Sequence, residues 1–133
     1  MNPRYAELLQ RAGLRCEYCH APAVAFNFPL EVEHIVPRAA GRDEDPGNLA
    51  VACRSCNIFK GAKFVGLDNE TSESVPLFHP RKDRWDDHFE VDTDSLAVRA
   101  KTAVGRVTIE LLRLNSDEQL FARGQWRRLE LYP

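Results

Sequence analysis

Four cysteines, arranged as two C-x-x-C pairs, constrain the fold of this chain more than any other feature of its sequence. The first pair is Cys16 and Cys19, and the second pair is Cys53 and Cys56. A C-x-x-C turn places two sulfur atoms on one side of a metal ion, and two such turns complete the tetrahedral shell that zinc prefers. A metal site also adds stability to the modest core of a chain of 133 residues. We therefore expect the four thiolates to hold one structural zinc ion, in a closed shell that does not activate water.

Disulfide bonds and a redox pair are the alternative interpretations of the cysteines. We find no signal peptide and no apolar run long enough to span a membrane, so we expect a cytoplasmic protein whose thiols stay reduced. A redox C-x-x-C normally lies in a βαβ context, which this sequence does not predict. Both alternatives are therefore weaker than zinc. Because four sulfurs already satisfy the ion, we expect His20, which follows Cys19, to be exposed.

The rest of the sequence predicts one α+β domain over residues 1–133, with a core at about 14–66 and a helical C-terminal extension at about 77–133. Apolar spacing and capping residues predict helices over residues 2–12, 55–65, 102–114 and 117–128. Short apolar runs predict strands over residues 24–28, 32–36 and 48–52, and a hairpin over residues 89–98. Turn-forming and polar residues predict loops over residues 38–47 and 66–76.

The order of motifs around the cysteines resembles a known family. The run C-x-x-C … E-H-I-V-P-R … G-N-L … C-x-x-C-N-x-x-K-G extends from Cys16 to Gly61. It resembles the HNH nuclease family, whose fold is the ββα-metal motif, two strands and a helix around a metal ion. The later segments 77–89, 102–106 and 111–115 also resemble the C-terminal half of a group of small bacterial HNH proteins. The resemblance implies a metal-dependent endonuclease that hydrolyses phosphodiester bonds, with DNA favoured over RNA as its nucleic-acid partner.

Four residues of this motif are the candidate catalytic residues. Cleavage of a phosphodiester requires an activated water and a counter-charge for the transition state. A neutral histidine is a suitable base near neutral pH, so we expect His34 to be the general base. The carboxylate of Glu33 is a hard ligand suited to Mg²⁺ or Mn²⁺. By resemblance, Asn57 is the second ligand of this catalytic metal, and Asn48 holds the loop and the histidine ring in place.

Two positions depart from the family pattern. Glu33 stands where Asp is frequent, and Asn57 stands where the bacteriocin-type members have His. Asn offers an oxygen ligand, so the change favours Mg²⁺ or Mn²⁺ over Zn²⁺ or Ni²⁺. Lys60 lies one turn beyond Asn57 on the same predicted helix face, and Lys63 lies a further turn on. We expect these two lysines to contact phosphates of the nucleic acid.

The charge of the chain argues against a protein that coats nucleic acid through bulk charge. The formal net charge is −2, whereas a nuclease needs only a local basic patch. Residues 99–130 carry seven Lys or Arg against four Asp or Glu, and the alternative to a basic patch there is a solvated helix face. The rival function is a non-catalytic zinc-knuckle module that binds nucleic acid or protein. That rival explains the cysteines but gives no reason for the E-H, N and N members of the motif to occur together.

Overall fold

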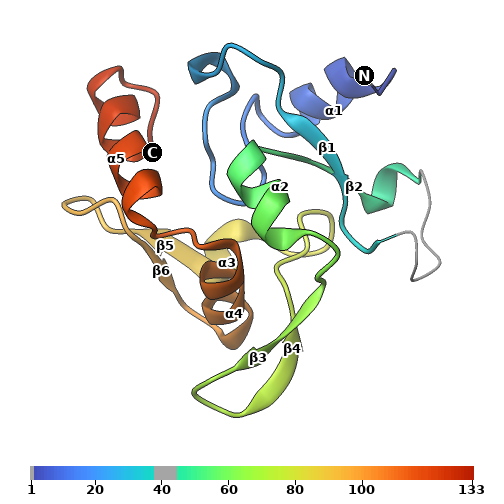
Figure 1. The fold of residues 1–133 in the computed structure, drawn as a ribbon, viewed down its shortest axis with the longest axis vertical. Coiled ribbons are helices and arrows are strands. Elements are labelled where there is room, and N and C mark those ends of the chain that lie inside the picture. The colour runs from blue at the N-terminus through green and yellow to red at the C-terminus, as the bar shows by residue number, and fades with distance from the viewer. Residues whose placement is uncertain (1, 38–44) are drawn as a thin grey trace.

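The computed structural model describes residues 2–37 and 45–133 (Figure 1). The helices are α1 (Tyr5–Arg11), α2 (Arg54–Lys60), α3 (Trp85–His88), α4 (Ala103–Leu112) and α5 (Asp117–Arg128). The strands pair antiparallel as β1 (Glu31–His34) with β2 (Leu49–Ala52), β3 (Val65–Asp68) with β4 (Glu73–Pro76), and β5 (Phe89–Val91) with β6 (Val98–Ala100). The predicted α+β class is therefore confirmed. Among the described residues, no helix has both the length and the apolar character needed to cross a membrane.

Strands β1 and β2 and helix α2 form the ββα unit of the fold. The register pairs Glu33 with Ala50 and His34 with Leu49, and every residue of β2 is buried. Helix α2 begins after Cys53, whose sulfur accepts a hydrogen bond from the Cys56 amide at 3.5 Å. Seven residues make too short a helix to be stable alone. Its stability comes from packing, because α2 contacts β1 on one side and α4 on the other (Figure 1).

The second half of the chain packs helix α4 against β3, β6 and α2. The approach is close at Gly105, where an added Cβ would lie 2.3 Å from the carbonyl oxygen of His88. Helix α4 can reach this position only because residue 105 has no side chain. The N-terminus of α4 is capped by Thr102, whose hydroxyl accepts from the Gly105 amide at 3.1 Å. The glycine and its cap thus fix where α4 lies.

Most predicted elements are present with shifted ends. The helix predicted at 117–128 is α5 with the same bounds, and the hairpin predicted at 89–98 is β5 and β6. The helix predicted at 55–65 is shorter, because α2 ends at Lys60 and Gly61 follows with a φ of 52°. The loop predicted at 38–47 lies largely outside the described residues.

Two predicted elements are wrong. Residues 24–28, predicted to be a strand, contain part of a short 3₁₀ helix (Ala23–Ala25) and continue as exposed chain. Residues 66–76, predicted to be a surface loop, contain most of the β3–β4 hairpin. This hairpin is tied to α4 by Asp68, whose carboxylate accepts two hydrogen bonds from Arg106 at 3.0 Å each. The guanidinium and the Thr71 hydroxyl hold the pKa of Asp68 well below its usual range.

Candidate active site

The four cysteines meet in one buried cluster. All four sulfurs lie within 4.8 Å of one another, and the Sγ atoms of Cys19 and Cys53 are 3.7 Å apart. No disulfide joins these four thiols. Two local turns supply the pairs: one follows α1, and the other forms the start of α2. Four converging buried thiols are the donor set of a closed structural metal site, such as that of zinc.

The thiols of the cluster interact strongly with one another. Hydrogen bonds with Cys16 and the other thiols lower the pKa of Cys53, and hydrogen bonds within the same group raise the pKa of Cys19 and Cys56. The lowered pKa favours the thiolate form of Cys53. A structural metal ion would replace these protons and take all four sulfurs as thiolates.

The first cysteine pair is covered by a segment from the second half of the chain. The ring centroid of Trp85 lies 4.1 Å from that of His20, and the Trp85 indole donates to the Tyr18 carbonyl oxygen at 2.9 Å. Burial lowers the pKa of His20 to about 4, so this side chain is neutral at neutral pH. The expectation that His20 is exposed is therefore wrong. Sequence analysis missed this contact because the two rings come from distant parts of the chain.

Three predicted site residues line one shallow hollow of about 390 Å³. The end of β1 supplies Glu33 and His34, and α2 supplies Asn57. The hollow is completed by Val32, Pro37, Gly61 and Ala62. His34 and Asn57 are partly exposed, whereas Glu33 is buried. A carboxylate, an amide oxygen and an imidazole are donors that suit a divalent cation with a preference for oxygen, so this donor set fits the catalytic metal that the sequence analysis expects.

The fourth predicted residue, Asn48, acts on the backbone that follows His34. Its Oδ1 accepts from the Val36 amide at 2.9 Å, and its Nδ2 donates to the Val36 carbonyl oxygen at 2.8 Å. The Ile35 amide donates to the Asn48 carbonyl oxygen at 2.9 Å. These bonds continue the β1–β2 pairing past the end of the strand. In the described structure Asn48 does not line the hollow, and it fixes the path of the chain there.

The Glu33 carboxylate is held from two sides inside the protein. The Tyr18 hydroxyl donates a short hydrogen bond to Oε1, and the Lys60 ammonium lies 3.0 Å from Oε2. Burial and the neighbouring carboxylate raise the pKa of Tyr18 well above its usual range, so the hydroxyl stays a donor. A carboxylate oxygen can accept more than one bond. Each oxygen of Glu33 therefore keeps capacity to accept a further bond.

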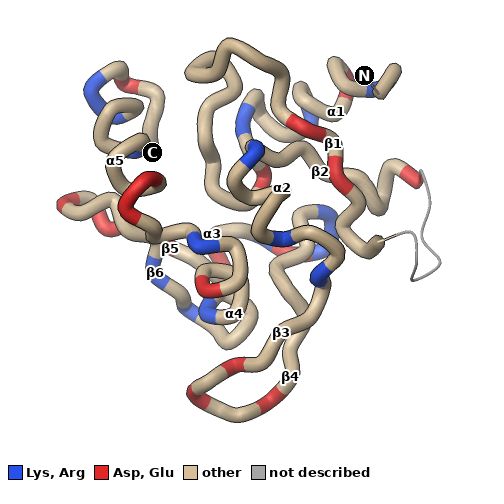
Figure 2. The backbone as a smooth tube through the Cα atoms, in the orientation of Figure 1, with Lys and Arg blue, Asp and Glu red and all other residues tan. Residues whose placement is uncertain are grey.

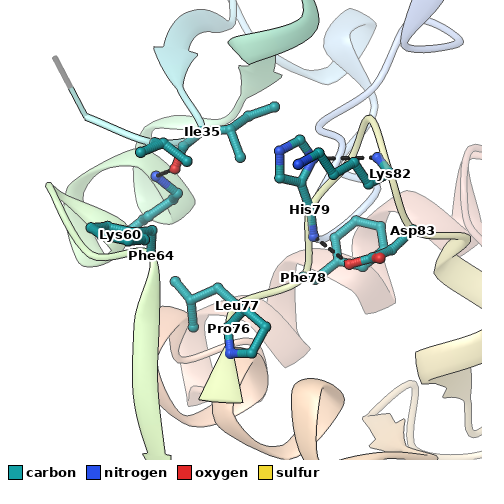
Figure 3. Close-up of a pocket in the computed structure, with 10 residues that line it drawn as sticks. Ile35, Lys60, Phe64, Pro76, Leu77, Phe78, His79, Lys82 and Asp83 are labelled. Atoms are coloured by element: carbon teal, nitrogen blue, oxygen red, sulfur yellow. Dashed lines mark hydrogen bonds between the residues drawn. The ribbon is translucent and has the colours of Figure 1, made fainter. Parts of the chain in front are cut away.

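Lys60 is buried, whereas the predicted phosphate contact requires an ammonium on the surface. Its side chain is 1% exposed, and its ammonium donates to the carbonyl oxygens of His34 at 3.0 Å and Ile35 at 2.9 Å. Figure 3 shows the second of these bonds, at the edge of a pocket of about 250 Å³ that Phe64 and Leu77 also line. A sequence signal existed, because Lys60 follows the buried Cys56 by four residues and therefore shares its helix face.

Lys63 differs from Lys60 in its surroundings. It is exposed, and its ammonium donates to the Phe59 carbonyl oxygen near the end of α2 at 3.2 Å. An exposed ammonium on the chain that leaves α2 can exchange this bond for a phosphate oxygen at little cost. Of the two lysines predicted to contact phosphate, Lys63 is the exposed one.

Sequence analysis missed Glu31, two residues before Glu33 on the same face of β1. Its Oε1 accepts from Asn57 Nδ2 at 2.5 Å, and its Oε2 accepts from Arg54 at 3.3 Å. The period-two pattern of a strand could have indicated this, because it places both glutamates on one face.

Several basic residues of the second half have partners within the protein. Arg99 and Arg106 pair with carboxylates, and Arg123 is fully buried against the carbonyl oxygens of Leu96 and Leu114. Figure 2 shows Lys and Arg distributed over many elements. The stretch 99–130 is therefore engaged mainly in internal contacts.

Comparison with known families gives a match within the first half of the chain. A family model described as HNH endonuclease matches residues 16–63, from the first cysteine of the cluster to Lys63. The matched span contains all four cysteines and the three residues that converge on the hollow. Neither the search of curated proteins nor the search of solved structures found a match.

Proposed function

Residues 16–63 belong to the HNH endonuclease family, and from this premise we propose that the protein is a metal-dependent endonuclease that hydrolyses phosphodiester bonds in DNA. The observation that carries the proposal is the convergence of Glu33, His34 and Asn57 on one hollow. The end of β1 and helix α2 thus bring a carboxylate, an imidazole and an amide together at one open hollow, as a metal-dependent hydrolase requires. We also propose that residues 1–133 act as one domain, because Trp85 joins the second half to the first cysteine pair.

The chemistry assigned to the hollow divides between its side chains. His34 takes a proton from a water molecule, whose oxygen forms the new bond to phosphorus as the bond to the leaving 3′ oxygen breaks. The products are a 5′ phosphate and a 3′ hydroxyl. Glu33 and Asn57 would hold Mg²⁺ or Mn²⁺, which when bound polarises the scissile phosphate and stabilises the leaving oxygen. Lys63 would contact a phosphate of the bound strand.

Two further residues shape the site without touching substrate. Asn48 and Lys60 hold the backbone on either side of the end of β1, at Val36 and at His34 and Ile35. A base must lie within hydrogen-bond reach of the water that it activates. Fixing the strand end therefore fixes the position from which His34 acts.

The experiment is nicking of supercoiled plasmid by the purified protein, with Mg²⁺, with Mn²⁺ and with EDTA, alongside His34→Ala. We expect cleavage that requires added metal and falls by about 10²–10⁴-fold in the variant, the range for loss of a general base. Bound zinc and the melting temperature should stay unchanged in His34→Ala. A matched RNA substrate tests the choice of DNA.

The rival function, a non-catalytic zinc module, predicts a different result. Wild-type protein that retains its zinc, binds DNA and cuts in neither metal would support the rival. Cleavage that survives His34→Ala would contradict the assignment of the base.

A further inference from the structure

The side-chain amide of Asn57 donates a hydrogen bond to Glu31. The Nδ2 atom of Asn57 lies 2.5 Å from Oε1 of Glu31, across the contact between α2 and β1. A carboxylate can only accept hydrogen bonds, so it requires the NH₂ end of the amide to face it. The contact therefore settles which end of Asn57 is nitrogen and directs the amide oxygen elsewhere.

We propose that Glu31 is a positioning residue, which orients Asn57 so that its amide oxygen faces the hollow and can ligate the catalytic divalent ion. The inference rests on the proposed function and adds to it a residue that the motif does not include. Asn57 lines the hollow together with Glu33 and His34, whereas Glu31 is not among the lining residues in the described structure. Glu31 thus acts through Asn57 and does not touch the ion.

The two glutamates of β1 have different partners, which explains their different roles. Glu31 and Glu33 lie on one face of β1, two residues apart, and are held by different partners. The Glu33 carboxylate is held by Tyr18 and Lys60 inside the protein. The Glu31 side chain is 26% exposed and is bound by residues of α2, namely Asn57 and Arg54. The Glu33 carboxylate therefore lines the hollow, and the Glu31 carboxylate holds Asn57, the second proposed ligand.

Without such a partner, the side-chain amide of Asn57 can turn either its oxygen or its NH₂ group toward the ion. The NH₂ end cannot ligate a cation, so each inverted conformer removes one ligand from the site. Partners outside the ligand shell commonly change metal affinity by about 10–100-fold. We expect an effect of this size from Glu31 on the affinity for a divalent ion, with little effect on folding because the side chain is partly exposed.

The test is Mn²⁺ binding to the zinc-loaded full chain without DNA, measured by electron paramagnetic resonance of free Mn²⁺. Glu31→Ala should weaken binding by about 10-fold or more, as second-sphere variants do. Glu31→Gln should stay close to wild type, because its amide oxygen can accept the same bond. Arg54→Ala is the matched control: it removes the other partner of Glu31, which is a surface contact, and should leave Mn²⁺ affinity unchanged. Zinc content and thermal melting should match wild type in all three variants.

The outcomes separate this inference from the proposed function. If binding depends on Asn57, tested with Asn57→Ala, but is unchanged in Glu31→Ala, the inference alone is overturned. If Glu31→Gln is as weak as Glu31→Ala, the charge of Glu31 matters directly and its role as a positioning residue is overturned. If wild-type protein binds no Mn²⁺, or Asn57→Ala binds normally, the metal site of the proposed function fails and the inference fails with it.

Discussion

Residues 16–63 and residues 85–133 are stabilised in different ways. In the first region the elements are short: β1 and β2 have four residues each, and α2 has seven. Elements of these lengths are marginal on their own. In the second region the strands β5 and β6 are shorter still, with three residues each, but helix α4 has ten residues and α5 has twelve, and each of these helices begins at a side-chain cap. The cysteine cluster therefore distinguishes the first region, and the longer packed helices distinguish the second.

The difference indicates where the geometry of the site comes from. Hydrogen bonds and ion pairs are directional, whereas apolar burial is not. Directional contacts fix His34 and Asn57, which line the hollow, through Lys60 and Glu31. A further such contact, from Asn48 to Val36, fixes the chain just past the end of β1. We therefore expect variants in the first region to alter both stability and the site, and variants in the second region to alter stability alone.

The largest expected effect is the loss of the cysteine cluster through Cys53→Ser. The variant removes one of four sulfurs and should lose the bound metal, together with most of the roughly 10–16 kcal/mol that binding contributes in structural zinc sites. We expect residues 16–63 to unfold, seen as loss of zinc by elemental analysis and loss of the cooperative melting transition. Ser55→Ala, in the same helical turn, should keep both. A Cys53→Ser protein that melts like wild type would show that the first region does not need its metal.

Lys60→Met should be the next most damaging change. Glu33 would be left buried without its ammonium, and breaking one partner of a buried pair costs about 3–5 kcal/mol. Urea unfolding measures this loss. The exposed Lys63→Met is the control and should change stability by less than roughly 0.5 kcal/mol. Adding Glu33→Gln to Lys60→Met should recover part of the loss. Equal losses in the two lysine variants would mean that the buried ion pair does not stabilise the first region.

Two helical glycines test the second region. Gly105→Ala should destabilise by about 1–3 kcal/mol, because its Cβ collides with the His88 carbonyl oxygen and α4 must move. Gly124→Ala, in α5, meets nothing within 4 Å and should stabilise the protein by up to about 1 kcal/mol. Chemical denaturation gives both values. Changes of opposite sign in the free energy of unfolding would confirm that close packing around helix α4 stabilises this region. Changes of the same sign would contradict it.

The sequence predicted the parts of the molecule that depend on local pattern. The C-x-x-C spacing predicted the cysteine cluster, and the caps and apolar spacing predicted α5 with its observed bounds. The run 24–28 is apolar, but within the described residues it joins none of the three sheets and instead begins with part of a short 3₁₀ helix. Residues 66–76 are polar, and they form a hairpin because α4 packs against β3. These two errors arise from tertiary contacts that no local pattern contains.

The same distinction applies to the candidate site. The motif identified the three residues that meet at the hollow, because their spacing is local to β1 and α2. It did not predict that Lys60 is buried, since this depends on three oxygens of residues 33–35, at and just past the end of β1. It also missed Glu31, whose role depends on the crossing of α2 over β1. Contacts between side chains of different elements are the part that required the structure.

The smallest expected effect lies where the two regions meet. Trp85→Phe keeps an aromatic ring against His20 but removes the indole donor to the Tyr18 carbonyl oxygen. Loss of one such hydrogen bond should destabilise by about 1 kcal/mol, measured by urea unfolding. The junction lies over the first cysteine pair and away from the hollow, so Mn²⁺ affinity should not change. Trp85→Ala, which also removes the ring contact, should cost more than Trp85→Phe by the same measurement. A fall in Mn²⁺ affinity in Trp85→Phe would show that the second region does shape the site, and would break the separation between the two regions.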